Sequence, residues 1–438
     1  MTPAIPDTRP ADPGDGATAD LSAAFRTAAR DHPEAAALQL GRRIYSYAEA
    51  DDTARRWAAA LTDAAGQRPR RVGVFAYRSP VSYLGALAAL YAGASVVPLD
   101  RTSPHELTRT MIESARPDVL LADSASALQL PRIAAEIHIP LVAPLADASL
   151  PLEVTARQRV LRRADIPANG AEPASGDDRD PAYMFFDGAC GLPPYPIAFS
   201  HAALGAFLRS VREQYAFGPE DRFAQVFDQS CDLSLFDLFA AWQAGACVVP
   251  LKPLHVLDPV RFADRQRITV WFSSPAVAEF ARQRGLLTPG CLPGLRWSFL
   301  GGAAVSEQVA TAWQEAAVES AVECWYGPPG LPVAGAVHRW DPRVSPGMCA
   351  RGLAPIGRPF PGVRMAVLDD GGRELSDEQT GELCFAGPGA GTRARASEWR
   401  RTGMSARRTP TGEYVRALAP GDGAGAATQR ALVGVAAG

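Results

Sequence analysis

The feature that most constrains the fold is a strand–helix–strand pattern in the N-terminal third of the chain. Residues 71–75 and 94–99 are short apolar runs typical of buried strands, and residues 81–92 between them form an apolar stretch of helical length. A third strand-like run follows at residues 118–122. Strands that alternate with crossover helices lie in a parallel sheet. We therefore predict an α/β protein with a mostly parallel sheet in this region.

The remaining sequence extends this pattern into an expected order of subdomains. Residues 151–180 are polar and are expected to be a surface connection, residues 183–186 begin a second series of strands and helices, and short strands with glycine turns follow residue 355. We predict two layered αβ subdomains with mostly parallel sheets and a small β-rich subdomain. The predicted segments are a disordered N-terminus at 1–19, the first αβ subdomain at 20–180, the second at 181–354 with a substrate pocket, the β-rich subdomain at 355–418, and a flexible tail at 419–438.

Composition excludes several classes of function. The formal net charge is −3, so no strongly basic face is expected and nucleic acid is not a predicted partner. No run approaches the roughly 20 apolar residues of a membrane helix, and the N-terminus lacks the layout of a signal peptide, so we expect a cytoplasmic protein without a membrane partner. The seven cysteines are scattered without a C-x-x-C pair, so we predict neither disulfides nor a metal site. Lys252 is the only lysine, and we interpret it as an exposed loop charge.

A series of short motifs occurs in one consistent order along the chain. Together they resemble the amino-acid adenylation domains of nonribosomal peptide synthetases, within the wider acyl- and aryl-adenylating superfamily. The resemblance covers residues 20–415 and implies the large N-terminal part of the adenylate-forming fold. The motifs that carry it are residues 45–49, 84–100, 228–237, 299–303, 326–328, 356–359, and 381–383 with 387–389.

The resemblance implies a substrate pocket around Asp232. In the family an aspartate at this position pairs with the ammonium group of the substrate, and such a charge-assisted contact is a strong anchor in a desolvated pocket. Asp232 could instead cap the helix that follows it, and the other positions could be ordinary core residues. The implied pocket residues, mostly large and apolar and so suited to a small or flat substrate, are Leu233, Phe236, Phe272, Phe299, Gly301, Trp325, Val333 and Ala334.

The positions that handle ATP in the family carry different side chains in this sequence. The phosphate loop corresponds to residues 187–196, where Tyr195 replaces the loop lysine, Asp187 adds negative charge, and three prolines remove backbone N–H donors. The glutamate that helps to hold Mg²⁺ corresponds to Gly330, and the aspartate that binds the ribose hydroxyls corresponds to Met404. The full set of positions predicted to form an altered nucleotide site is Asp187, Gly188, Cys190, Gly191, Tyr195, His201, Tyr326, Gly330 and Met404.

Two further features of the nucleotide side leave alternatives open. The sequence after residue 419 does not resemble the family's hinge, so we expect the lid subdomain to be missing. His201 is either a ligand-facing histidine or a structural one. A nucleophilic Cys190 next to His201 is a weaker hypothesis, because no spacing rule makes these two residues neighbours.

Three functions from different classes remain open. The first is an adenylation-domain-like protein of bacterial natural-product biosynthesis that binds a small amino acid, carboxylate or acyl intermediate without normal ATP-dependent activation. The second is an active acid-adenylating ligase whose lid comes from a partner, and only this alternative requires ATP and Mg²⁺ as cofactors. The third is a noncatalytic scaffold that binds a carrier protein or a biosynthetic partner enzyme.

Overall fold

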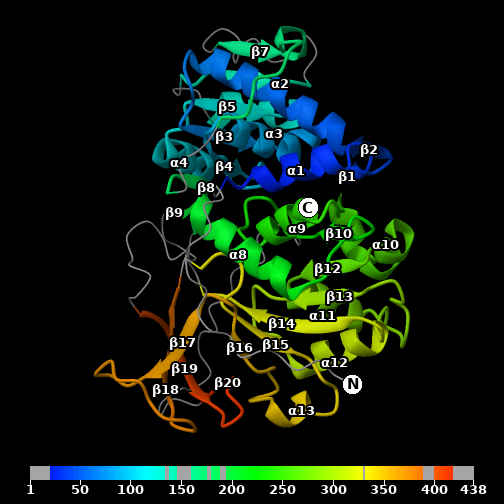
Figure 1. Cartoon of the computed structure of the whole chain (residues 1–438), viewed down its shortest axis with the longest axis vertical. Coiled ribbons are helices and arrows are strands. Elements are labelled where there is room, and N and C mark those ends of the chain that lie inside the picture. Colours follow the sequence, from blue (N-terminus) through cyan, green and yellow to red (C-terminus); the bar gives the residue numbers. More distant parts are fainter. Residues whose placement is uncertain are drawn as a thin grey trace.

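The computed structural model describes residues 20–133, 138–145, 159–174, 179–187, 194–328, 331–387 and 399–417. The predicted disordered N-terminus and flexible tail lie outside these residues. The described part contains three β-sheets, with the seven-stranded sheet at one end of the molecule and the four-stranded sheet at the other (Figure 1).

The seven-stranded sheet has the strand order β7-β6-β5-β3-β4-β8-β9. All of its neighbouring pairs are parallel except β8 with β9, which confirms the predicted parallel sheet. Its strands are β3 (Arg71–Phe75), β4 (Ser95–Leu99), β5 (Val119–Ala122), β6 (Leu141–Ala143), β7 (Val160–Arg162), β8 (Pro181–Asp187) and β9 (Tyr195–Ser200). The helices between them are α3 (Pro80–Tyr91), α4 (His105–Ala115), α5 (Ser124–Ala127) and α6 (Leu130–Ile133), and η1 (Arg163–Asp165) follows β7.

Two details of this sheet differ from the prediction. The run at 183–186 does not begin the second series, because it lies in β8 and Tyr183 pairs with Val96 of β4. An apolar strand pattern shows that a strand is buried but not which sheet edge it joins. The polar segment 151–180 is also more than a connection, since it contains the short edge strand β7, which needs little apolar surface.

The nine-stranded sheet has the order β16-β15-β14-β13-β12-β10-β11-β1-β2. It takes β1 and β2 from the N-terminal region, where Leu38 pairs in parallel with Val248 of β11, so these strands join a sheet built mainly from the second half of the chain. The strands are β1 (Ala36–Leu40), β2 (Arg43–Ser46), β10 (Arg222–Gln225), β11 (Cys247–Pro250), β12 (Val270–Ser273), β13 (Trp297–Leu300), β14 (Ala321–Tyr326), β15 (Ala336–Arg339) and β16 (Arg358–Pro359).

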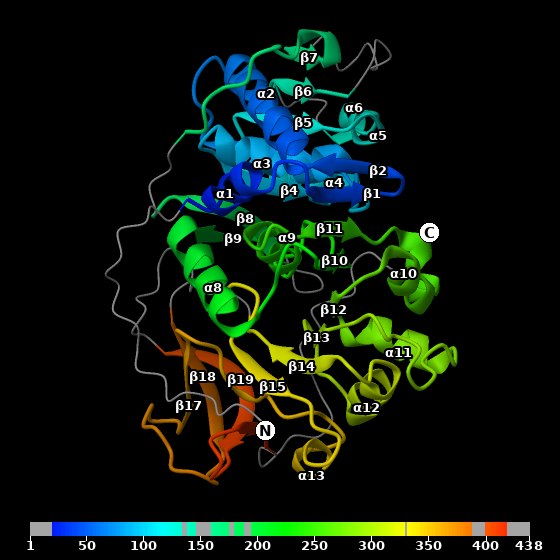
Figure 2. The ribbon, with the colours of Figure 1, turned by 45° about the vertical axis from the view of Figure 1, so that its right-hand side comes forward.

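The elements of the central region are drawn in green and yellow, and the N-terminal helices in blue (Figure 2). Their bounds are α1 (Ala23–Asp31), α2 (Tyr47–Ala65), α8 (His201–Gln214), α9 (Ser234–Gln243), η2 (Pro253–Leu257), α10 (Pro259–Gln266), α11 (Pro275–Gln283), α12 (Glu307–Ala316) and α13 (Ser345–Met348). The small sheet is antiparallel, as expected for the β-rich region, with β17 (Arg364–Leu368), β18 (Gly381–Ala386), β19 (Arg400–Arg408) and β20 (Tyr414–Arg416).

The largest hydrophobic core connects the two αβ layers. Helices α3 and α9 are buried along nearly their whole length, and their side chains belong to one continuous apolar cluster. Two buried hydrogen bonds fix the N-terminal elements against this core. The Tyr47 hydroxyl at the start of α2 donates to the carbonyl of Ala246 at 2.7 Å, and the Trp242 indole of α9 donates to Ala37 at 3.1 Å.

We expect Tyr47→Phe to lower the free energy of unfolding by about 1–2 kcal/mol, because the variant leaves the buried Ala246 carbonyl without its donor. Urea denaturation followed by circular dichroism measures the change. Tyr45→Phe, on the partly exposed strand β2, is the matched control and should change stability by less than about 0.5 kcal/mol. Equal losses in the two variants would contradict the role given to the buried bond.

Candidate functional site

The candidate pocket lies at one edge of the nine-stranded sheet. Strands β10, β12, β13 and β14 are parallel to one another, so their carboxyl ends meet at the same edge. Ligand sites of α/β sheets are found at this edge. The loop between β10 and α9 carries Asp232 there, and the β13 and β14 ends bring Gly301 and Trp325.

Four aromatic residues predicted to line the pocket contact one another. The Trp325 ring centroid lies 4.8 Å from that of Phe236, 5.2 Å from Phe272 and 4.6 Å from Phe299. All four side chains are buried, so they form a packed cluster. This arrangement brings these four predicted residues together.

Asp232 is half-buried in the turn before α9. The N-cap residue of α9 is Leu233, and it makes no side-chain capping bond, so the interpretation of Asp232 as the N-cap is wrong. Its backbone carbonyl accepts from the Leu235 N–H at 3.1 Å, while its Oδ1 lies 3.8 Å from the Cys231 Sγ. The Asp232 carboxylate therefore lies in the turn that precedes α9.

The loop after β13 packs tightly against the aromatic cluster. A Cβ atom on Gly301 would lie 3.1 Å from the Phe272 ring, and one on Gly302 would lie 2.7 Å from Leu233. Gly302 also has a φ of +84°, which favours glycine. Val333, with a φ of +57°, and Ala334 are buried in the turn before β15. The backbone of the loop thus approaches the aromatic cluster directly.

A buried carboxylate that the sequence reasoning missed holds Trp325 in place. Glu323 Oε2 accepts from the Tyr215 hydroxyl at 2.7 Å and from the Trp325 indole at 3.0 Å. Its Oε1 accepts from two guanidinium nitrogens of Arg339 at 3.0 and 2.7 Å. Burial, followed by the Glu323 charge, raises the pKa of Tyr215 well above its usual value. In the sequence, Glu323 could have been noticed as the single charged residue inside the apolar strand 321–326.

The two described ends of the predicted phosphate loop face each other. Asp187 ends β8, Tyr195 begins β9, and the two residues are paired across the strands. The Tyr195 hydroxyl donates to Asp187 Oδ2 at 3.1 Å. Gly188, Cys190 and Gly191 between them lie outside the described residues, as does Gly330.

His201 has a structural contact. It is buried at the start of α8, and its Nδ1 accepts from the Leu21 N–H at 3.1 Å. Burial lowers its pKa, so the charged form is disfavoured. Lys252 is exposed before η2, beside the Gly41 turn, which agrees with its interpretation as a loop charge.

Met404 and Tyr326 are brought together by Arg416. The Arg416 Nη1 donates to the Met404 Sδ at 3.2 Å, and its guanidinium lies 5.8 Å from the Tyr326 ring centroid. Arg416 and Tyr326 line a cavity of about 20 Å³, whose other walls come from residues 303–305, 324–325 and 354–356. Burial lowers the pKa of Arg416. Sequence reasoning did not single out this arginine.

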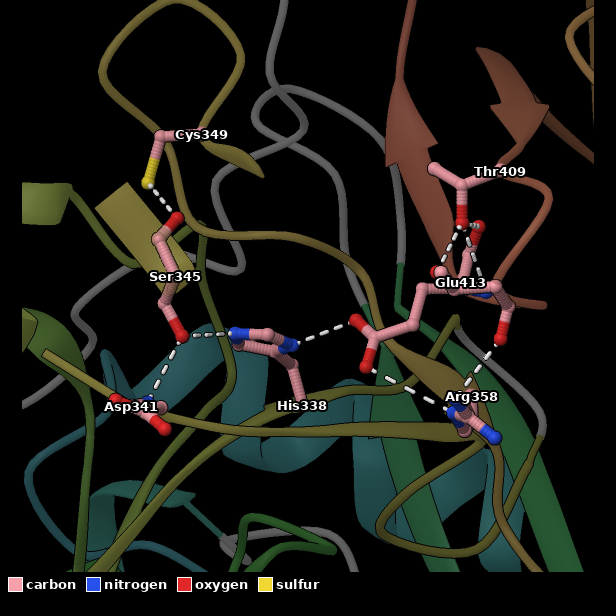
Figure 3. A network of polar contacts seen from close by, with 8 residues as sticks. His338, Asp341, Ser345, Cys349, Arg358, Thr409 and Glu413 are labelled. Atoms are coloured by element: carbon pink, nitrogen blue, oxygen red, sulfur yellow. Dashed lines mark hydrogen bonds and ion pairs between the residues drawn. The ribbon is translucent and has the colours of Figure 1, made fainter. Parts of the chain in front are cut away.

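A polar network ties the small sheet to β15 (Figure 3). His338 Nδ1 lies 2.7 Å from Glu413 Oε2 and its Nε2 lies 2.8 Å from Ser345 Oγ. The order of groups resembles an acyl-transfer triad, but Ser345 is 1% exposed and its Oγ also accepts from the Asp341 N–H at 2.8 Å. The network therefore acts as a structural link between β15, α13 and the β19–β20 turn.

Two other observations concern the described residues as a whole. A larger cleft of about 610 Å³ lies between α1, α2 and residues 172–173, and it contains none of the predicted site residues. In the part of the chain that the structure describes, no three histidine, cysteine or acidic side chains gather as a metal site, and no helix is long and apolar enough to cross a membrane.

Comparison with known proteins identifies the family of this fold and site. Residues 25–392 match the family model described as AMP-binding enzyme. The chain belongs to the AMP-binding enzyme family. The structure of IdnL7 shares 37% sequence identity with a TM-score of 0.81, over 91% of this chain and 81% of that one. The Vibrio cholerae adenylation domain AlmE, solved with glycyl-adenosine-5′-phosphate, matches with a TM-score of 0.79 at 22% identity over 93% of this chain and 81% of that one.

The chain is also similar to curated sequences of a synthetase and a ligase. It is 30% identical over 375 residues to the probable non-canonical nonribosomal peptide synthetase CymA of Salinispora arenicola, covering 84% of this chain and 4% of CymA. It is 30% identical over 335 residues to the L-proline–[L-prolyl-carrier protein] ligase of Streptomyces coelicolor, covering 72% of this chain and 60% of the ligase. The chain thus spans only part of these relatives.

We expect Glu323→Gln to lower the free energy of unfolding by about 2–4 kcal/mol, because an amide cannot accept all the hydrogen bonds made by the buried carboxylate. The change is measured by urea denaturation. Glu220→Gln is the matched control, because Glu220 also pairs with an arginine, Arg296 at 3.4 Å, but is 70% exposed. This variant should lower the free energy of unfolding by less than about 1 kcal/mol. Similar values for both variants would show that Glu323 does not anchor Trp325.

Proposed function

We propose that this chain is an adenylation-domain-like protein of bacterial natural-product biosynthesis that binds a small amino acid or carboxylate without the ATP-dependent activation typical of its family. The observation that carries this proposal is the Tyr195–Asp187 hydrogen bond at the two ends of the phosphate loop. Tyr195 offers a neutral hydroxyl at the position that the resemblance matches to the family's lysine, and Asp187 adds an acid at the other end of the loop.

The phosphate chemistry explains why this pair matters. In the family a carboxylate attacks the α-phosphate of ATP, pyrophosphate leaves, and negative charge builds up on phosphate oxygens. Such charge is stabilised by cations and N–H donors that are already in position. Tyr195 directs its proton to Asp187, and an ionised Asp187 repels a triphosphate by roughly 1–4 kcal/mol at about 4 Å, depending on solvent exposure. The pair therefore opposes phosphate binding.

The ribose and metal positions support the same proposal. Met404 offers a thioether, which is a weak acceptor for ribose hydroxyls, and its sulfur already accepts from Arg416. Gly330 has no side chain to bind Mg²⁺. These residues do not fit ATP·Mg²⁺ as the family holds it, so we derive no catalytic step through the nucleotide.

The pocket side supports binding of a small molecule. Asp232 precedes Leu233, which lies against the Gly302 backbone, and a carboxylate there can pair with a substrate ammonium group. By analogy with the L-prolyl-carrier protein ligase, a carrier protein or a biosynthetic partner enzyme is the proposed source or recipient of the bound group.

We expect no amino-acid-dependent exchange of pyrophosphate into ATP with the purified protein, because the phosphate positions oppose formation of the adenylate. The assay uses a panel of small amino acids with ATP and Mg²⁺, and the L-prolyl-carrier protein ligase with proline is the positive control. A robust exchange signal with any amino acid would refute the proposal and favour the active-ligase alternative.

We expect Asp232→Asn to weaken binding of the preferred small amino acid at least about 10-fold, because a charge-assisted hydrogen bond contributes roughly 1.5–3 kcal/mol. Isothermal titration calorimetry over a panel of small amino acids measures this change. Asp52→Asn, an exposed residue on α2, is the control with the same charge change and should bind like the wild type. Unchanged affinity in the Asp232 variant would remove this residue from the pocket.

A further inference from the structure

We propose that Arg416 receives the carboxylate group of the bound acid, in the cavity that it lines with Tyr326 and residues 303–305. This inference rests on the proposed function, because an acid that is not converted to an adenylate keeps its negative charge. It names the chemical class that the site would take, a small monocarboxylate anion, and the residue that would bind it.

Arg416 is a cation that has no anionic partner among the described residues. Its contacts within the described part of the chain are the Met404 thioether and the face of the Tyr326 ring, and it takes part in no ion pair there. Burial lowers its pKa, which means that the site disfavours the charge it contains. A charged group of this kind is stabilised when it gains a counter-ion.

The existing contacts are also easy to replace. A thioether is a weak acceptor, and an arginine has five N–H donors in a planar fork that matches a carboxylate. The Met404 Sδ uses one of these donors. A carboxylate could therefore bind the guanidinium through two parallel hydrogen bonds while the Tyr326 ring stays against it.

The size of the cavity favours a carboxylate over a phosphate. Its volume is about 20 Å³, and a cavity needs roughly 10–15 Å³ to hold one water molecule. A group with two terminal oxygens needs less of this room than a tetrahedral group with four. The small side chains of Ala303 and Ala304 and the apolar side chain of Ile356 line the remaining space.

Trp325 connects the cavity with the aromatic cluster. Trp325 lines the cavity and also packs against Phe236 and Phe299. The loop after β13 contacts both regions, since residues 303–305 line the cavity while Gly302 lies against Leu233. Trp325 and the loop after β13 therefore contact both the cavity and the aromatic cluster.

The test uses acetate as the probe, observed by saturation-transfer NMR with the full chain. We expect saturable binding to the wild type and at least about 10-fold weaker binding to Arg416→Gln, because a charge-assisted pair is lost. Arg416→Lys should be intermediate, since it keeps the charge but not the planar fork. Arg343→Gln, in an exposed turn, is the charge-matched control and should bind like the wild type.

The outcomes separate this inference from the proposed function. Equal acetate affinity in the wild type and Arg416→Gln, with both proteins folded by circular dichroism, would overturn the assignment of Arg416, as would no saturable binding to the wild type. Tighter binding of inorganic phosphate than of acetate would overturn the choice of a carboxylate. None of these results depends on pyrophosphate exchange or on Asp232, so the proposed function would still be judged by its own assays.

Discussion

A buried carboxylate is unfavourable unless donors surround it, and the geometry of the candidate site depends on such a group. Glu323 lies inside the nine-stranded sheet and accepts from Tyr215, Trp325 and Arg339. These bonds fix the Trp325 ring, which packs in the aromatic cluster on one side and lines the Arg416 cavity on the other. One buried side chain therefore holds a ring that both halves of the site share.

The sequence predicted local structure well where apolar periodicity was strong. The strand at 71–75 and the helix at 81–92 correspond to β3 and α3 almost residue for residue. It misplaced the run at 183–186, because partner choice depends on contacts distant in sequence. The aromatic pocket residues were found through the family resemblance. Glu323 and Arg416 were not, since their roles depend on neighbours that only the folded chain brings together.

The proposed site combines residues suited to binding a small ligand with residues that oppose the binding of ATP. In the proposed function, Asp232 in the turn before α9 pairs with the ammonium group of a small ligand. At the nucleotide side, Tyr195 is engaged by Asp187 and Met404 is engaged by Arg416. Membership of the AMP-binding enzyme family fixes the fold but not the reaction, so the proposed loss of ATP use follows from these pairs rather than from the fold.

The most direct test of this account is a calorimetric titration of the intact protein with ATP·Mg²⁺ beside a panel of small amino acids. The account predicts saturable heat for at least one small amino acid and none for ATP·Mg²⁺ at millimolar concentration. Saturable binding of ATP·Mg²⁺ that strengthens in the presence of the amino acid would contradict it, because such coupling is expected of a protein that prepares the two for adenylate formation.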